Sequence, residues 1–237
     1  MRQRVRRTAD ASYSAFFRML QSKRLDALLL ALIIVAALPS HADVDRYATN
    51  ARLLICVRNA DSLCIERALR DGAAVKSRNR LGESALLIAL KQNRPDIAQV
   101  LLAAGANVNE AAVDGITPLM AAAYAGQVEM ARPLLERGAK PDAVDRIGKN
   151  AMTYAAGEGH TEIVRLLLTN GVDPNAVYRN NLTALMWAAG YGQADTAHAL
   201  IEAGARVDLV DDRGKSALDM ARDFKSAQTI EVLERAQ

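Results

Sequence analysis

Apolar and polar positions along most of the chain fall into blocks that return every 33 residues. Each block holds two short runs of apolar residues at helical spacing, separated by a turn. The second run of one block reads Ile163, Val164, Leu166, Leu167 and Leu168. This spacing gives each short helix an apolar face. Because one helix pair cannot cover that face alone, the pattern predicts pairs stacked in a row, with the apolar faces buried between them.

Glycine occupies two columns of this repeat. The first column ends each predicted second helix, where a left-handed residue commonly closes a helix; it consists of Gly72, Gly105, Gly138, Gly171 and Gly204. The second column lies in the extended turn between blocks, at Gly82, Gly115, Gly148, Asn181 and Gly214. Asn is one of the few other residues that tolerate a positive φ, so we expect Asn181 to adopt the backbone conformation of its glycine counterparts.

A column of small polar residues precedes each predicted first helix. Their side-chain oxygens can accept from the open N–H groups at a helix start. The column consists of Ser84, Thr117, Asn150, Thr183 and Ser216. Ala or Pro follows each of them, at a position where the missing N–H of Pro costs nothing. Each block therefore predicts a helix hairpin of about 20 residues followed by an extended turn.

These residues resemble the ankyrin repeat. The segments that match best are Thr117-Pro118-Leu119 with Ala122-Ala123, and Gly159-His160-Thr161-Glu162-Ile163-Val164. The resemblance implies an all-α fold, an ankyrin-repeat solenoid of about six stacked helix-turn-helix units with short β-hairpin-like loops. It covers residues 49–237, with repeats expected at about 49–80, 81–113, 114–146, 147–179, 180–212 and 213–237.

The chain departs from the family at one column. Ankyrin repeats often place His after the Thr-Pro-Leu segment, and that His joins a hydrogen-bond network between repeats. Here the column reads Leu54, Leu87, Met120, Thr153, Met186 and Asp219. We therefore expect this network to be absent.

The N-terminal segment reads as a secretory signal peptide. Basic residues precede an uninterrupted apolar run at 27–38, and small residues stand at Ser40 and Ala42. This layout predicts a signal peptide at 1–42 with cleavage after Ala42, followed by a short linker at 43–48. Met19 is an alternative start. The competing interpretation is a retained membrane anchor, but a helical span needs about 20 apolar residues and this run is shorter.

Composition narrows the classes of partner. Apolar residues make up 51% of the 237 residues and aromatics 4%, which favours small, repeated helix contacts. The net charge of +3 comes from the N-terminal segment, because residues 43–237 hold 23 basic and 25 acidic side chains and carry a net charge of −2. Nothing in this balance favours nucleic acid.

The two cysteines both fall in the first repeat. Cys56 lies in an inward column of its first helix and Cys64 in an inward column of the second, so their side chains are expected to face each other across the hairpin. In an exported protein such a pair is expected to form a disulfide. The alternative is a pair of buried free thiols that fill space.

No pattern in the sequence indicates chemistry. Nucleotide-binding loops, zinc-protease motifs and nucleophile elbows are absent from the sequence, and neither His160 nor His198 has ligand-spaced partners. We therefore expect no catalytic residues, no metal site and no cofactor.

The resemblance implies that a protein partner binds along the first helices and at the tips of the extended turns. By column, the candidates on the helices are Tyr124, Tyr154, Trp187, Tyr191 and Phe224, and those at the tips are Arg146 and Arg179. Large aromatic side chains are enriched at binding hot spots. The alternative is that these rings pack against neighbouring repeats.

The sequence therefore predicts a non-catalytic adaptor or inhibitor, monomeric and exported to a bacterial periplasm, with release outside the cell as the alternative location. Its contact with a membrane would be transient, through the signal peptide. A self-associating structural module and a membrane-tethered scaffold of the cell envelope are the alternative functions.

Overall fold

The computed structural model describes residues 41–236 of the chain. The chain divides into two compact units, residues 1–47 and 48–237, and the repeats belong to the second. The described residues form twelve α-helices and one 3₁₀ turn, with no strand among them. The expected all-α solenoid of stacked helix pairs is confirmed. The predicted signal peptide lies outside the described residues except for its last two, and cleavage after Ala42 stays a prediction.

Each repeat contributes a first and a second helix. The first helices are α3 (His41–Arg58), α5 (Ala85–Lys91), α7 (Pro118–Tyr124), α9 (Ala151–Glu158), α11 (Ala184–Gly190) and α13 (Ala217–Asp223). The second helices are α4 (Ser62–Arg70), α6 (Pro95–Ala103), α8 (Val128–Glu136), α10 (Thr161–Thr169), α12 (Ala194–Glu202) and α14 (Ala227–Glu234). The 3₁₀ turn η1 spans Arg179–Asn181. Residues 43–48, expected as a linker, lie within α3.

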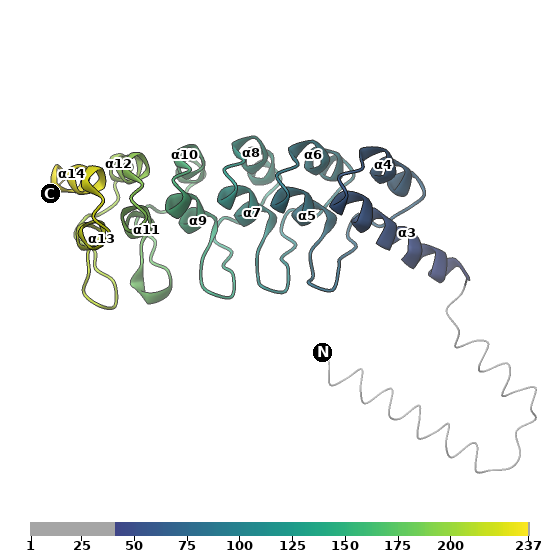
Figure 1. Ribbon diagram of the computed structural model, residues 1–237, viewed down its shortest axis with the longest axis horizontal. Helices are drawn as coiled ribbons and strands as arrows, with labels where there is room; N and C mark the ends of the chain where they lie inside the picture. The colour runs from purple at the N-terminus through teal and green to yellow at the C-terminus, as the bar shows by residue number, and fades with distance from the viewer. Residues whose placement is uncertain (1–40, 237) are drawn as a thin grey trace, which may run out of the picture. The chain divides into compact units, whose positions relative to one another are not determined.

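The helices of the repeat unit form two layers (Figure 1). The second helices line up along one layer and the first helices along the other, and the extended turns project beyond the first helices. From α5 onward, each first helix contacts the next first helix, and each second helix contacts the next second helix. One apolar cluster runs through the stack from Leu53 in α3 to Leu233 in α14. The repeats thus bury their apolar faces against one another, as the pattern predicts.

The predicted helix caps are present. In the cap column from Ser84 to Ser216, each side-chain oxygen accepts from the backbone N–H three residues later, at 3.0–3.3 Å. The glycines of the first column close the second helices. At Gly105, φ is +84°, Gly105 N donates to the Leu102 carbonyl, and Ala106 N donates to the Leu101 carbonyl. This is the Schellman arrangement, which satisfies carbonyls that a helix end leaves open.

A different set of side chains takes the place of the missing His network. Gln127 Nε2 donates to the Leu90 carbonyl at 2.7 Å, and His160 Nε2 donates to the Tyr124 carbonyl at 3.0 Å. Gln193 Nε2 donates to the carbonyl of Gly157 at 3.1 Å. Each of these side chains reaches back from the turn of one repeat to the C-terminal end of the preceding first helix. Carbonyls there have no partner within their own helix, so these contacts join neighbouring repeats.

The extended turns end in five tips, at residues 79–83, 112–116, 145–149, 178–182 and 211–215. In each tip the backbone N–H of the first residue donates to the carbonyl of the fifth. Backbone bonds also join neighbouring tips, as from Val113 N to the Leu81 carbonyl at 2.8 Å. Asn181 has a φ of +54°, which confirms the expectation that it adopts the conformation of the glycine column.

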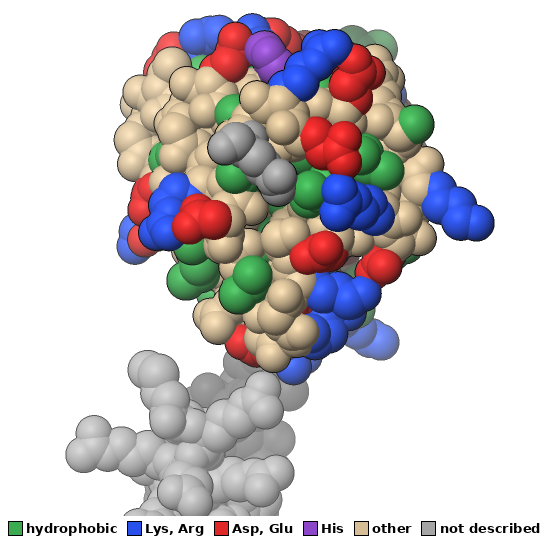
Figure 2. Space-filling view, turned by 90° about the vertical axis from the view of Figure 1, so that its left-hand side faces the viewer, with side chains coloured by type: hydrophobic (Ala, Val, Ile, Leu, Met, Phe, Trp, Pro, Cys, Tyr) green, Lys and Arg blue, Asp and Glu red, His purple; other side chains and the backbone are tan. Residues whose placement is uncertain are grey.

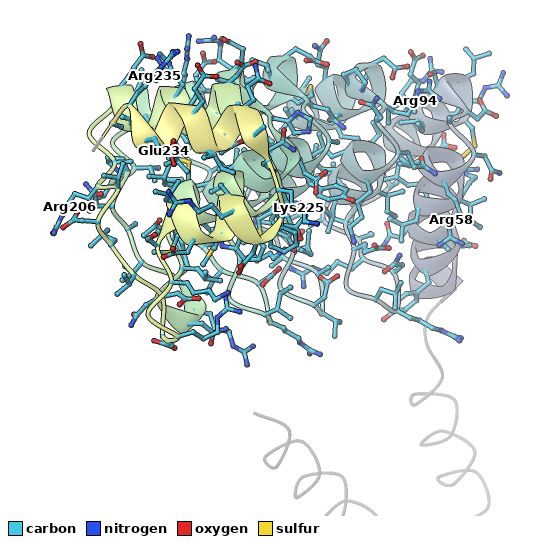
Figure 3. All side chains as sticks on the ribbon, turned by 60° about the vertical axis from the view of Figure 1, so that its left-hand side comes forward. Arg58, Arg94, Arg206, Lys225, Glu234 and Arg235 are labelled. Atoms are coloured by element: carbon cyan, nitrogen blue, oxygen red, sulfur yellow. A yellow bond between two sulfur atoms is a disulfide. The ribbon has the colours of Figure 1, made fainter. Side chains whose placement is uncertain are left out.

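The C-terminal end of the stack is polar and of mixed charge. Acidic and basic side chains are scattered over the face in view, with some hydrophobic side chains between them (Figure 2). Arg222 pairs with Glu234 across α13 and α14. Lys225 lies in the turn between these helices, where it has a φ of +57° (Figure 3).

Candidate functional site

Five aromatic side chains stand along the first helices of repeats three to six. We call them the aromatic face: Tyr124, Tyr154, Trp187, Tyr191 and Phe224. Tyr124 ends α7, Tyr154 lies within α9, Trp187 lies within α11, and Tyr191 and Phe224 follow the last residues of α11 and α13. Tyr154 and Trp187 are 33 residues apart, as are Tyr191 and Phe224, and equivalent positions in a solenoid point the same way.

The rings differ in exposure. Tyr124, Tyr191 and Phe224 are 56%, 58% and 68% exposed, whereas Tyr154 and Trp187 are half-buried and pack against the apolar cluster. The alternative of packing against neighbouring repeats therefore describes Tyr154 and Trp187, while partner binding by the exposed rings stays a prediction. Three rings face solvent, and two also support the stack.

The rings form two contact pairs across the face. Tyr124 and Tyr154 meet edge to face with centroids 5.8 Å apart, and Trp187 stacks on Tyr191 at 6.0 Å. Glycines of the preceding repeat make room for them. A Cβ on Gly157 would lie 3.9 Å from both Trp187 and Tyr191, and one on Gly190 would lie 3.9 Å from Phe224. Each later ring thus rests over the first helix of the repeat before it.

Lys149 lies between the two ring pairs. Its Nζ is 4.1 Å from the Trp187 ring centroid and 5.3 Å from that of Tyr154. A cation over a ring face is attracted by the ring quadrupole. The sequence did not single out Lys149. The signal available was its place directly before the cap residue Asn150, a column that reads Glu83, Ile116, Lys149, Leu182 and Lys215.

A buried carboxylate orients the Tyr154 ring. The Tyr154 hydroxyl donates to Asp145 Oδ2 at 2.6 Å, while Asp145 Oδ1 accepts from the backbone N–H groups of Ile147 and Lys149 at 2.9 Å. Burial and this hydrogen bond both raise the pKa of Tyr154 above its usual range. The phenol therefore stays protonated at neutral pH, and it serves to position the ring.

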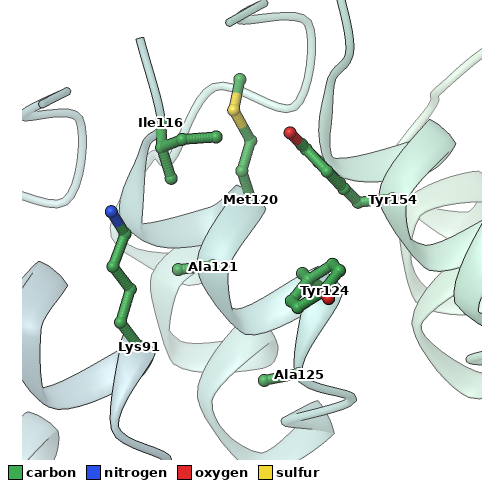
Figure 4. Close-up of a pocket in the computed structure, with 7 residues that line it drawn as sticks. All are labelled: Lys91, Ile116, Met120, Ala121, Tyr124, Ala125 and Tyr154. Atoms are coloured by element: carbon green, nitrogen blue, oxygen red, sulfur yellow. The ribbon is translucent and has the colours of Figure 1, made fainter. Parts of the chain in front are cut away.

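A recess of about 450 Å³ opens beside Tyr124 and Tyr154, over α7 and between α5 and α9 (Figure 4). Ile116, Met120 and Ala121 form its apolar wall, and Lys91 stands at its other side. Lys91 is already paired with Glu83 at 2.8 Å. The cavity is thus an apolar recess with aromatic walls, a shape that accepts a hydrophobic side chain.

The structure does not bring all the candidates together. The ring pairs and Lys149 form one continuous set, and Phe224 stands one repeat further along. Arg146 and Arg179 lie at the tips, both exposed. Arg179 packs against Gly148 of the neighbouring tip and lines a second pocket with Trp187, whereas Arg146 is not among the residues that line either pocket.

The structure joins Cys56 and Cys64 by a disulfide, with Cα atoms 5.6 Å apart. The bond links the end of α3 to the first turn of α4. Within the described part of the chain, no three His, Cys, Asp or Glu side chains gather in a way that could hold a metal ion.

Between residues 41 and 236, no helix combines the length and the apolar character that a membrane crossing requires. The apolar run at 27–38 lies outside the described residues.

Comparison with protein-family models identifies the class. The model described as ankyrin repeats (3 copies) matches residues 53–145, 111–178, 134–211 and 152–235. These matches together span 53–235, well over half of the chain, and the chain therefore belongs to the ankyrin-repeat family. No individual curated protein matches the sequence. Ankyrin repeats are generally protein–protein interaction modules.

Proposed function

We propose that this chain is a non-catalytic adaptor or inhibitor that binds a protein partner through the aromatic face and the neighbouring tips. The observation that carries the proposal is the set of three exposed rings, Tyr124, Tyr191 and Phe224, the first of which borders an apolar recess of about 450 Å³. Exposed apolar patches of this kind mark interaction sites, and Tyr is enriched among hot-spot residues.

The mechanism is equilibrium binding. The rings are held in place by their contacts with one another and with the preceding repeat, so little freedom is lost when a partner covers them. A preorganised surface binds more tightly because less conformational entropy is lost on association. The proposal includes no catalytic step and no cofactor.

The proposed location is a bacterial periplasm, with the protein acting as a monomer and with release outside the cell as the alternative. The signal-like N-terminus and the disulfide support this, since disulfides persist in oxidising compartments. N-terminal sequencing of the protein from the cell envelope tests it: a chain beginning at Asp43 is expected, and an intact N-terminus would indicate a membrane-tethered scaffold.

Self-association is the alternative function, and the same exposed rings favour it because they could pair two copies. Light scattering separates the two functions. A monomer of the full chain has a mass of 25.6 kDa. A stable dimer that disperses on substitution of Tyr191 would support the self-associating module over the adaptor.

Photo-crosslinking in the native cell tests the proposed function directly. A photoreactive phenylalanine analogue is placed at Tyr124, Tyr191 or Phe224, and at the exposed Leu63 of α4 and Val100 of α6 as matched positions in the second-helix layer. We expect discrete adducts with one protein from the aromatic face and none from the matched positions. Adducts from α4 and α6 alone, or none anywhere, would refute the proposal.

A further inference from the structure

A second pocket lies between the tips at 145–149 and 178–182. Its volume is about 220 Å³. Lys149 and Arg179 bring cations to it, and Ile147, Leu182 and Trp187 bring apolar surface. It lies next to the aromatic face, because Trp187 belongs to both.

The row of backbone bonds between tips is interrupted at this pocket. Arg146 N donates to the Asp114 carbonyl at 2.9 Å, and Asp212 N donates to the Asn180 carbonyl at 3.1 Å. Among the described residues no equivalent bond joins Ile147 to Arg179. The tip at 178–182 contains the 3₁₀ turn η1 and two consecutive residues of positive φ, Asn180 and Asn181, where other tips have a single glycine. The altered turn therefore leaves a recess in place of the bond.

The two cations of the pocket lack carboxylate partners. In the equivalent positions of other repeats, Glu83 pairs with Lys91 and Lys215 pairs with Asp223. The position that would pair with Lys149 is Gly157, so Lys149 has no ion pair among the described residues, and neither has Arg179.

The nearby carboxylates are engaged by other groups. Asp145 accepts from the Tyr154 hydroxyl and two backbone N–H groups, and Asp212 accepts from Asn181 Nδ2 at 2.8 Å. Neither carboxylate forms an ion pair with Lys149 or Arg179, so both cations stay available to an incoming anion.

Trp187 contributes apolar surface to the pocket. Its indole Nε1 is buried and has no hydrogen-bond partner in the structure, and because almost none of its surface is accessible it is closed to a ligand. Recognition of an anion therefore falls to Lys149 and Arg179. Two cations beside an apolar wall are the complement of a carboxylate carried on an apolar segment.

We propose that this pocket binds an Asp or Glu side chain from an acidic, otherwise apolar segment of the protein partner. The inference rests on the proposed function and gives the partner its chemistry. A volume of about 220 Å³ suits one side chain. The net charge of −2 over residues 43–237 opposes a long polyanion such as nucleic acid.

The single Trp of the chain provides the readout. The ¹⁵N-labelled full chain is titrated with pairs of blocked pentapeptides in which a central Glu between Phe and Leu is changed only to Gln, while the Trp187 indole N–H signal is followed. Inorganic phosphate and acetate form separate arms. We expect the Glu peptide to shift the signal and to bind about fivefold to tenfold more tightly than its Gln counterpart.

Variants assign the effect to the pocket. K149Q and R179Q should each abolish the preference for Glu, and R179Q leaves in place the Lys149 ammonium that lies over the Trp187 ring. K215Q is the matched control, since Lys215 occupies the same column but is paired with Asp223; it should retain the preference.

Three results would overturn the inference: equal binding of the Glu and Gln peptides, a Trp187 signal that does not move, or phosphate binding as tightly as the peptide, which would indicate a simple anion site. Failure here with persisting crosslinks from Tyr124 and Tyr191 would leave the proposed function intact. Crosslinks absent while the Glu preference holds would refute the proposed function alone.

Discussion

Single side chains hold neighbouring repeats in register. Gln127 is the most buried example: 2% of it is exposed, and its Nε2 satisfies the carbonyl of Leu90, itself fully buried. Gln92 makes the equivalent bond to the Arg58 carbonyl at 2.9 Å, but at an exposed position where water can replace it. The same hydrogen bond therefore contributes more to stability at Gln127 than at Gln92.

We predict that Gln127→Ala lowers the free energy of unfolding by about 1–2 kcal/mol, because it removes a buried hydrogen bond between repeats, while the Leu90 carbonyl keeps only the Asn93 N–H at 3.0 Å. Urea unfolding followed by circular dichroism measures the change. Gln92→Ala serves as the control. It should cost well under about 1 kcal/mol, since the exposed Arg58 carbonyl can accept from water instead. Equal losses in both variants would show that burial does not set the strength of this contact.

At one backbone position, a substitution is expected to raise the stability of the fold. Lys225 has a φ of +57° at the turn after α13, in a column that holds Gly126, Gly159 and Gly192 in other repeats. A side chain in this region costs about 1 kcal/mol, partly offset because Gly gains more freedom on unfolding. Lys225→Gly should therefore raise stability by up to about 1 kcal/mol, measured by thermal melting. Lys225→Ala should give no such gain; if it does, the side chain rather than φ is responsible.

At the scale of elements, the first hairpin depends on a covalent link. Cys56 and Cys64 join α3 to α4 in a repeat that has a neighbour on one side only among the repeats. Cys64→Ala should lower stability by about 2–3 kcal/mol, since the disulfide closes a short loop in the unfolded chain. A reductant should lower the melting temperature of the unaltered protein and leave that of the variant unchanged. If the reductant leaves the melting temperature of the unaltered protein unchanged, the disulfide does not stabilise the hairpin.

The start of α13 carries a pH-dependent cap. Asp219 Oδ2 accepts from the Ser216 hydroxyl at 2.7 Å and from Ser216 N at 2.9 Å. These bonds lower the pKa of Asp219 below its usual 3.8. The pKa of Asp219 is lower in the folded state than in the unfolded state. Its contribution to stability is therefore complete above the pKa of the unfolded state and is lost as the pH falls through the pKa of the folded state.

We therefore predict that Asp219→Asn flattens the loss of stability below about pH 4, as measured by urea unfolding at a series of pH values. The same substitution at the exposed Asp195, in the first turn of α12, is the control. It should leave the decrease of stability with falling pH unchanged. A slope unchanged by Asp219→Asn would mean that other carboxylates govern acid unfolding.

For the whole molecule, the sequence was sufficient to predict the features that depend on local backbone chemistry. Ser84 and its equivalents cap helices, Gly105 closes one, Asn181 takes a positive φ, and Cys56 meets Cys64, because each depends on the periodic pattern alone. Long-range packing was not predictable in the same way. Ile55 and Ile88 share a column, yet they are 58% and 6% exposed, because their surroundings differ between an end repeat and an inner one.

The aromatic face shows the same limit. Three neighbouring columns predicted its five members, but not that Gly157 would leave room for Trp187 to pack inward, nor that Lys149 would lie over two rings. The contacts of Trp187 with Gly157 and Lys149 join positions 30 or more residues apart, so they depend on side-chain size and charge in two repeats at once. Trp187→Ala would for this reason reduce stability as well as binding, which makes the exposed Tyr124 and Tyr191 cleaner probes.

The most direct test of the central claim is the dissociation constant of the crosslinked partner for Tyr124→Ala and Tyr191→Ala, compared with Leu63→Ala on α4. We predict that each Tyr substitution weakens binding about tenfold or more, with the melting temperature nearly unchanged and Leu63→Ala neutral. Unaltered affinity in both Tyr variants, or an equal loss in Leu63→Ala, would contradict the account.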